Sequence, residues 1–128
     1  MSYYFNRTIK GSFEEALERV KLSLKKEGFG ILTEIDVKET LKKKLDADFQ
    51  EYRILGACNP SFAYRALQVE NKIGTMLPCN VIVHEVSKGS VEVAAVDPVA
   101  SMRAVENPAL LSVAREVKER LQRVVTSL

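Results

Sequence analysis

The sequence predicts an α+β domain in which an antiparallel sheet of about five strands carries helices packed on one face. Some segments alternate between apolar and polar residues or are continuously apolar, which is typical of strands. Between them lie segments whose apolar residues recur at helical spacing. The last two strand-like runs flank a short turn at residues 87–89, which is the pattern of a hairpin and favours an antiparallel sheet. The length of 128 residues and the 46% apolar content suit one core, so we expect residues 1–128 to form a single domain.

Five segments have the pattern of strands. They are residues 3–9, 30–36, 50–57, 79–86 and 90–96. In the second strand, strict alternation would place Ile31, Thr33 and Ile35 on the same face of the sheet. Residues 73–77 are expected to form a turn before the hairpin.

Each predicted helix begins at a residue that caps helix N-termini. These residues are Ser12, Asp36, Asn59 and Asn107. The first two have a glutamate three positions later, which is the capping-box spacing, and the last two precede a proline, a favoured first helical residue. The short helix after Asp36 would present Val37, Leu41 and Leu45 on its apolar side.

Composition and charge disfavour several classes of protein. A net charge of +2 gives no argument for a nucleic-acid or membrane partner, and no apolar run is long enough to span a bilayer. The N-terminal residues lack the pattern of a signal peptide, so we expect a cytoplasmic protein. The lysines at positions 42–44 are expected to form a solvated helix face.

A Cys-Asn dipeptide occurs twice, at the two ends of the segment that contains the third predicted helix. Cys58-Asn59 precedes Pro60, and Cys79-Asn80 follows Pro78. Loop residues at strand–helix boundaries often carry binding or catalysis. These are the only two cysteines, too few for a disulfide scaffold.

Four stretches together carry a resemblance to a known family. They are residues 28–37, 52–60, 77–81 and 96–98, in that order along the chain. The chain resembles the family of domain of unknown function 302 over essentially its whole length. The resemblance implies a compact α+β fold similar to the TATA-binding-protein architecture, and homodimers, but no reaction and no DNA binding.

Cys58 and Cys79 admit two interpretations. A cysteine beside a helix start can have a lowered pKa and act as a thiolate, and two neighbouring cysteines can form a redox pair or bind a soft metal. Alternatively both are small buried side chains, because free cysteine packs like a modest apolar residue. Their spacing does not match a closed zinc site, and no metal or cofactor class is indicated.

The remaining candidates are polar residues near the predicted strand ends. Asn59 and Asn80 offer amide donors and acceptors for a ligand, although Asn59 is also expected to cap a helix. Glu34 and Asp97 could contribute acid–base chemistry if they converge, whereas Asp97 before Pro98 is also a natural turn residue. His84 has no evident catalytic partner in sequence and is expected to be an ordinary, partly exposed strand residue.

These observations leave three functions open. The first is a homodimeric small-ligand-binding module whose pocket lies near the two Cys-Asn loops, with Glu34 and Asp97 nearby. The second is a thiol-based redox enzyme or soft-metal-binding protein that uses Cys58 and Cys79. The third is a structural or assembly protein in which these motifs only hold loops.

Overall fold

Five antiparallel strands form one sheet in the computed structural model, which describes residues 2–128. The strands are β1 (Tyr4–Lys10), β2 (Gly30–Asp36), β3 (Tyr52–Cys58), β4 (Cys79–Ser87) and β5 (Ser90–Val96). Their order across the sheet is β1-β5-β4-β3-β2, so the predicted hairpin of β4 and β5 lies inside the sheet and β1 and β2 are its edges. The predicted α+β class and antiparallel sheet are confirmed. The likeness to the TATA-binding protein stays a prediction.

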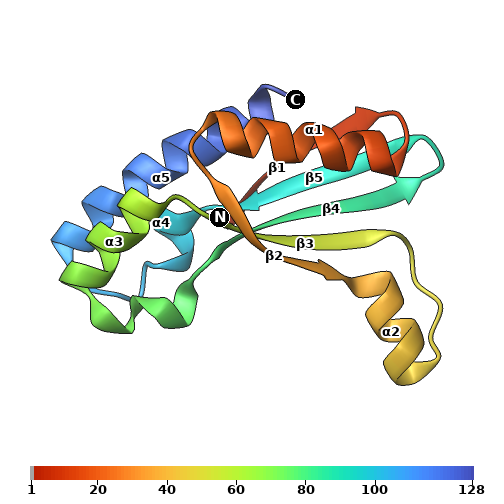
Figure 1. The fold of residues 1–128 in the computed structure, drawn as a ribbon. Coiled ribbons are helices and arrows are strands. Elements are labelled where there is room, and N and C mark those ends of the chain that lie inside the picture. The colour runs from red at the N-terminus through yellow and green to blue at the C-terminus, as the bar shows by residue number, and fades with distance from the viewer. Residues whose placement is uncertain (1) are drawn as a thin grey trace.

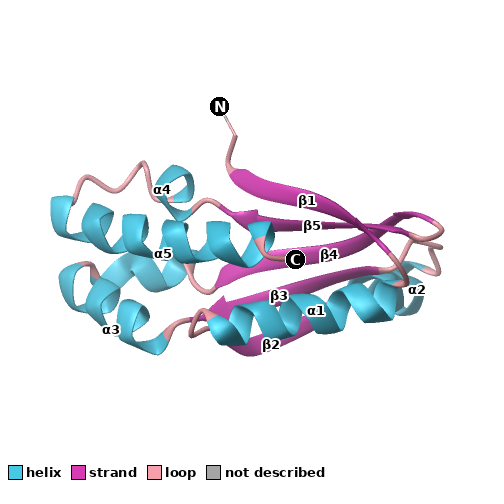
Figure 2. Cartoon of the chain, turned by 90° about the horizontal axis from the view of Figure 1, so that it is seen from above, coloured by secondary structure: helices cyan, strands magenta, loops and turns pink. Residues whose placement is uncertain are grey.

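Two long helices cover one face of the sheet, as Figures 1 and 2 show. They are α1 (Phe13–Lys26) and α5 (Pro108–Thr126). Both carry an apolar stripe at helical spacing, and these stripes meet the inward-facing valines of β4 and β5 in one core. Burial of these apolar side chains is the main force that holds the helices on the sheet.

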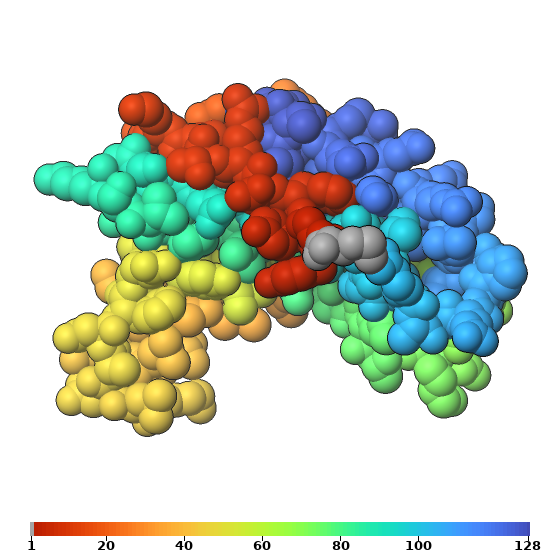
Figure 3. All heavy atoms as spheres, turned by 180° about the vertical axis from the view of Figure 1, so that it is seen from behind, coloured from red at the N-terminus to blue at the C-terminus, as the bar shows by residue number. Residues whose placement is uncertain are grey.

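Four shorter elements extend beyond the covered face. They are α2 (Val37–Leu45), α3 (Pro60–Val69), the 3-10 helix η1 (Asn71–Met76) and α4 (Pro98–Ser101). At one end of the sheet lie α3, η1 and α4, whereas α2 projects from the opposite end, away from α1 and α5 (Figure 1). The space-filling view shows the underside hollowed between these two projections (Figure 3). The turn expected at residues 73–77 is wrong, because η1 occupies most of this segment.

Three of the four predicted helix caps are confirmed. The side chains of Ser12, Asp36 and Asn107 each accept a hydrogen bond from a backbone N–H in the first turn of their helices. Asn59 occupies the N-cap position of α3, but its side chain makes no capping hydrogen bond. Asp97, which was expected to lie in a turn, caps α4 instead.

The alternation predicted for β2 is wrong at its start. The β2–β3 register shifts between Ile31 and Thr33, so that Ile31 pairs with Ala57 and Thr33 with Gly56. These two partners are consecutive and therefore face opposite sides of the sheet. The irregularity turns Ile31 towards the core and leaves Leu32 66% exposed.

Candidate functional site

An apolar cavity of about 340 Å³ lies at the end of the sheet where β3 ends and β4 begins. Its walls combine the two Cys-Asn loops with the inner sides of α3 and α5, including Ala63, Ala66 and Ala114. Small side chains at these helical positions leave the space that larger ones would fill. The exposed side chains of Leu32 and Leu67 also line the cavity, so apolar surface continues from the interior to its mouth.

The two cysteines border this cavity from neighbouring strands. Cys79 pairs with Ala57 in the β3–β4 ladder, so Cys58 is offset by one residue from the position opposite Cys79. Both thiols are free; Cys79 is buried and Cys58 is half-buried. Burial, with a smaller contribution from Cys58, raises the pKa of Cys79 to about 11, so its thiol is neutral at pH 7.

Asn59 is the polar side chain in the cavity wall, and one long-range and one local hydrogen bond fix its position. Its Nδ2 donates to the backbone oxygen of Glu27 at 3.3 Å, and its Oδ1 accepts from the Ser61 hydroxyl at 3.3 Å. Arg120 donates to the same Glu27 oxygen at 3.1 Å. The Asn59 amide therefore ties the start of α3 to the end of α1, while its Oδ1, the atom that would cap α3, accepts from the Ser61 hydroxyl instead.

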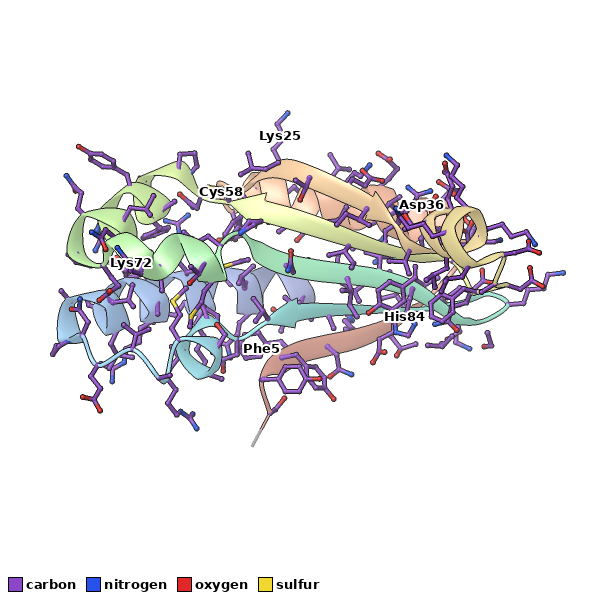
Figure 4. All side chains as sticks on the ribbon, turned by 90° about the horizontal axis from the view of Figure 1, so that it is seen from below. Phe5, Lys25, Asp36, Cys58, Lys72 and His84 are labelled. Carbon is purple, nitrogen blue, oxygen red and sulfur yellow. The ribbon has the colours of Figure 1, made fainter. Side chains whose placement is uncertain are left out.

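The other three candidate residues lie apart from the cavity. Asn80 follows Cys79 directly, but strand alternation turns its exposed side chain to the opposite face of the sheet. Figure 4 looks onto that face, with Cys58 towards the end that carries α3 and His84 towards the end near α2. The structure thus brings Cys58, Asn59 and Cys79 together and separates Asn80.

Glu34 belongs to a charged cluster farther along β2. It accepts from Lys21 at 2.9 Å and from Arg53 at 2.6 Å, and Arg53 also pairs with Asp36 at 3.3 Å. The hydrogen bond from Lys21, joined by that from Arg53, lowers the pKa of Glu34. A carboxylate held in this way supports the packing of α1 on the sheet and is poorly suited to general acid–base catalysis at neutral pH.

Asp97 is also occupied by structural contacts. Its Oδ1 accepts from the backbone N–H groups of Val99 and Ala100, and its Oδ2 lies 3.3 Å from Lys118 Nζ. Neighbouring Pro98 lines the cavity, but Asp97 itself does not. Its contribution is to hold α4 against α5.

His84 is more constrained than an ordinary strand residue. It is half-buried and has hydrogen-bond partners at both ring nitrogens, Gln50 at 2.9 Å and Glu92 at 2.7 Å. Within residues 2–128 there is no group of three or more His, Cys, Asp or Glu side chains arranged to hold a metal ion. No helix in the same range is long and apolar enough to cross a membrane.

Comparisons with known proteins identify the family. The model of the family described as "Domain of unknown function DUF302" matches residues 5–128. The chain belongs to this family. A crystal structure of an uncharacterised conserved DUF302 protein from Bacillus stearothermophilus is 30% identical, with 98% of each chain covered and a TM-score of 0.90. A comparison with curated proteins finds no match.

Membership of the DUF302 family therefore assigns no reaction to the residues that line the cavity. The sequence did not predict that helices would contribute to the cavity. An apolar stripe on α3 or α5 has the same spacing whether it packs in a core or faces a cavity. Small side chains within those stripes, such as Ala63 and Ala66, were the only available signal.

Proposed function

We propose that this DUF302 protein is a small-ligand-binding module that holds an apolar ligand in the cavity beside the two Cys-Asn loops. The observation that carries the proposal is the continuity of apolar surface from the buried floor at Cys79 to the exposed side chains of Leu32 and Leu67. An exposed apolar rim costs free energy in water, and a bound apolar group would remove that cost.

The cavity restricts the class of ligand. Its volume of about 340 Å³ is in the lower part of the range for small-molecule pockets, about 300–1,000 Å³. Asn59 supplies the one side-chain amide in a wall that is otherwise apolar or thiol. A medium-length aliphatic chain or a small ring system, with at most one polar end directed at Asn59, matches these walls.

The thiol-based alternative has less support. A nucleophilic or metal-binding cysteine functions as a thiolate, whereas the raised pKa of Cys79 keeps this thiol protonated at neutral pH. The buried Cys79 thiol instead behaves as part of the apolar floor. We therefore assign the Cys79 thiol to the lining of the binding cavity, which Cys58 also borders.

A neutral dye tests the binding proposal. N-phenyl-1-naphthylamine fluoresces more strongly in apolar surroundings, so its titration reports occupation of the cavity. Ala63→Phe fills space in the wall, while Ala109→Phe makes the same change at an exposed position of α5. We expect Ala63→Phe to weaken dye binding at least about tenfold, equivalent to about 1.4 kcal/mol, and Ala109→Phe to leave it unchanged.

Melting temperatures without dye verify that both variants fold, and Ala63→Leu provides a smaller change at the same site. Equal binding by the wild type, Ala63→Leu and Ala63→Phe would place the dye elsewhere. Absence of any binding to the wild type would contradict an apolar ligand.

We further propose that the module is a homodimer in which a second copy covers α2. No residue of this helix is fully buried, and its apolar side consists of Val37 and Leu41, which are half-buried, and Leu45, which is 71% exposed. Ile35 and Phe49, on the segments that flank α2, are also exposed. A partner that removed these side chains from water would need to bury at least about 1,000 Å² in total to form a stable interface.

Sedimentation velocity tests the dimer separately. The wild type should sediment as a dimer at micromolar concentration, and Leu45→Glu should shift it to monomer. Leu22→Glu, at a 60% exposed position of α1, is the matched control and should leave the dimer intact. A monomeric wild type, or equal effects of both substitutions, would contradict an interface at α2.

A further inference from the structure

A second hollow lies on the face of the sheet that α1 and α5 leave open. It has a volume of about 370 Å³, and its polar and aromatic wall consists of Tyr3, Tyr4, Tyr52, Asn80 and Glu92. We call it the tyrosine hollow. Its floor is the apolar part of β4 and β5, and its lining includes neither lysine nor arginine. Among the described residues that line the hollow, Glu92 is therefore the one charged side chain, and it shares the wall with three tyrosines.

A chain of hydrogen bonds fixes the Glu92 carboxylate. His84 Nε2 lies 2.7 Å from Glu92 Oε1, and Asn6 Nδ2 donates to Oε2 at 2.8 Å. Because a carboxylate only accepts, Nε2 carries the proton in this bond, and Gln50 Nε2 lies 2.9 Å from Nδ1 on the other side of the ring. His84 and Asn6 together thus hold both oxygens of the Glu92 carboxylate in place.

The same contacts keep Glu92 ionised. Its pKa is lowered by the hydrogen bond from Asn6 and then by that from His84. Its side chain remains 27% exposed, so it is accessible from the hollow. The carboxylate is held in one place before any ligand arrives, which reduces the entropy lost on binding.

Three tyrosines line the same hollow as this charge. The Tyr52 ring lies against His84 with a centroid separation of 5.1 Å and against Phe49 at 6.0 Å. Burial raises the pKa of Tyr52, with further contributions from Glu92 and Tyr3, so its phenol stays neutral. Tyr3 and Tyr4 are in edge contact at 5.0 Å. Neutral aromatic faces attract cations through their quadrupole.

We infer that the tyrosine hollow binds an alkylammonium group, with aromatic rings around the methyl groups and Glu92 supplying the opposite charge. Weakly hydrated quaternary ammonium groups suit aromatic walls, because they give up water readily and are attracted to ring faces. An anionic ligand would be repelled by Glu92. The inference is independent of the apolar cavity, which lies at the end of the sheet and uses different residues.

Choline and its neutral isostere 3,3-dimethyl-1-butanol test the role of charge. The chain has no tryptophan, and three of its four tyrosines line the hollow, so tyrosine fluorescence reports on this site. At about 10 mM, enough to occupy a site of millimolar affinity, choline should change the emission and the neutral isostere should not. Equal responses to the two compounds, or no response to choline, would overturn the inference.

Substitutions then assign the response to the hollow. Tyr52→Leu and Glu92→Gln should each weaken choline binding about tenfold, because each removes one of the two attractions. Tyr64→Leu removes the fourth tyrosine, which is 65% exposed on α3, and should have no effect. Because Tyr52→Leu and Tyr64→Leu each remove a fluorophore, binding to all variants is also measured from the choline methyl signal in proton NMR. Retained affinity in both Tyr52→Leu and Glu92→Gln would overturn the assignment.

Vesicles distinguish the source of the ammonium group. Binding to free choline alone indicates a soluble ligand. Additional co-sedimentation with phosphatidylcholine vesicles, reduced by Glu92→Gln, indicates a lipid headgroup. Either pattern supports the site, and absence of choline binding would overturn it.

Discussion

The apolar cavity and the tyrosine hollow use opposite faces of the same strands. Consecutive residues of β4 show the division: Cys79 lines the cavity, whereas Asn80 lines the hollow. The cavity has helices above it and no charged side chain among the described residues of its wall, while the hollow is open to solvent and includes a fixed carboxylate. Alternation along a strand therefore allows one short segment to contribute to two chemically different surfaces.

The two surfaces should also differ in the forces that govern binding. Ligands of the cavity gain free energy in proportion to the apolar area that they bury. Ligands of the hollow depend on a charge and on aromatic faces whose positions are set in advance. Substitutions that change volume should affect the first surface, and substitutions that change charge should affect the second.

The largest expected effect is at Gly56, which lies on β3 between the two surfaces. A Cβ at this position would overlap Thr33 Oγ1 and would lie 2.8 Å from Pro78 Cγ. We expect Gly56→Val to lower the free energy of unfolding by about 3 kcal/mol, because Pro78 has no rotamer by which to move away. Chemical denaturation measures this loss.

Gly30→Val on β2 is the matched control for Gly56. A Cβ there meets only the Cys58 backbone oxygen, at 3.9 Å, so the substitution should change stability by less than about 1 kcal/mol. Similar losses at both glycines would refute the close packing of Pro78 on β3.

The next effect concerns Cys79 and alkaline pH. Its folded-state pKa of about 11 exceeds the ordinary value of 9.0, so the folded protein retains a proton that the unfolded chain loses. This contribution is fully present below pH 9 and is lost as pH rises towards 11, reaching about 2 kcal/mol. The free energy of unfolding should fall less steeply between pH 9 and 11 in Cys79→Ala than in the wild type.

Cys58→Ala should retain most of the wild-type slope over the same pH range, because burial is the larger cause of the raised pKa of Cys79. Parallel slopes for the wild type and Cys79→Ala would mean that the Cys79 thiol is not buried. That result would contradict its place in the floor of the cavity.

A smaller effect should distinguish the two asparagines. Asn59→Ala removes the bond to the Glu27 oxygen and should cost about 1 kcal/mol, whereas Asn80→Ala changes an exposed side chain and should cost at most about 0.5 kcal/mol. Thermal or chemical denaturation of both variants measures the difference. A greater loss at Asn80 would contradict its placement on the open face.

Local signals in the sequence predicted the fold better than the site. The caps at Ser12, Asp36 and Asn107 depend on residues two or three positions away, and all three were confirmed. Asn59 has the same local signal as Asn107, a following proline, but its amide bonds to Glu27, 32 positions earlier. No local pattern contains that contact.

The open face was difficult to predict for a related reason. His84 and Glu92 come together because β4 and β5 pair in a particular register, and Asn6 joins them from β1. The hairpin could be predicted from its turn, but the position of β1 beside β5 required the complete sheet. The irregularity in β2 reverses the orientation of Ile31. No glycine or proline follows Gly30 in this strand, so the sequence contains no residue that marks the irregularity.

The most direct test of the binding proposal is methyl NMR with 1-octanol as the apolar probe. Carbon-13 labelling of alanine methyl groups gives separate signals for Ala66 and Ala114 in the cavity and for Ala94 in the tyrosine hollow. We predict that octanol shifts the signals of Ala66 and Ala114 with a common dissociation constant and leaves Ala94 unchanged. A shift of Ala94 alone, or no shift of Ala66 and Ala114 at saturating octanol, would contradict the apolar cavity as the binding site.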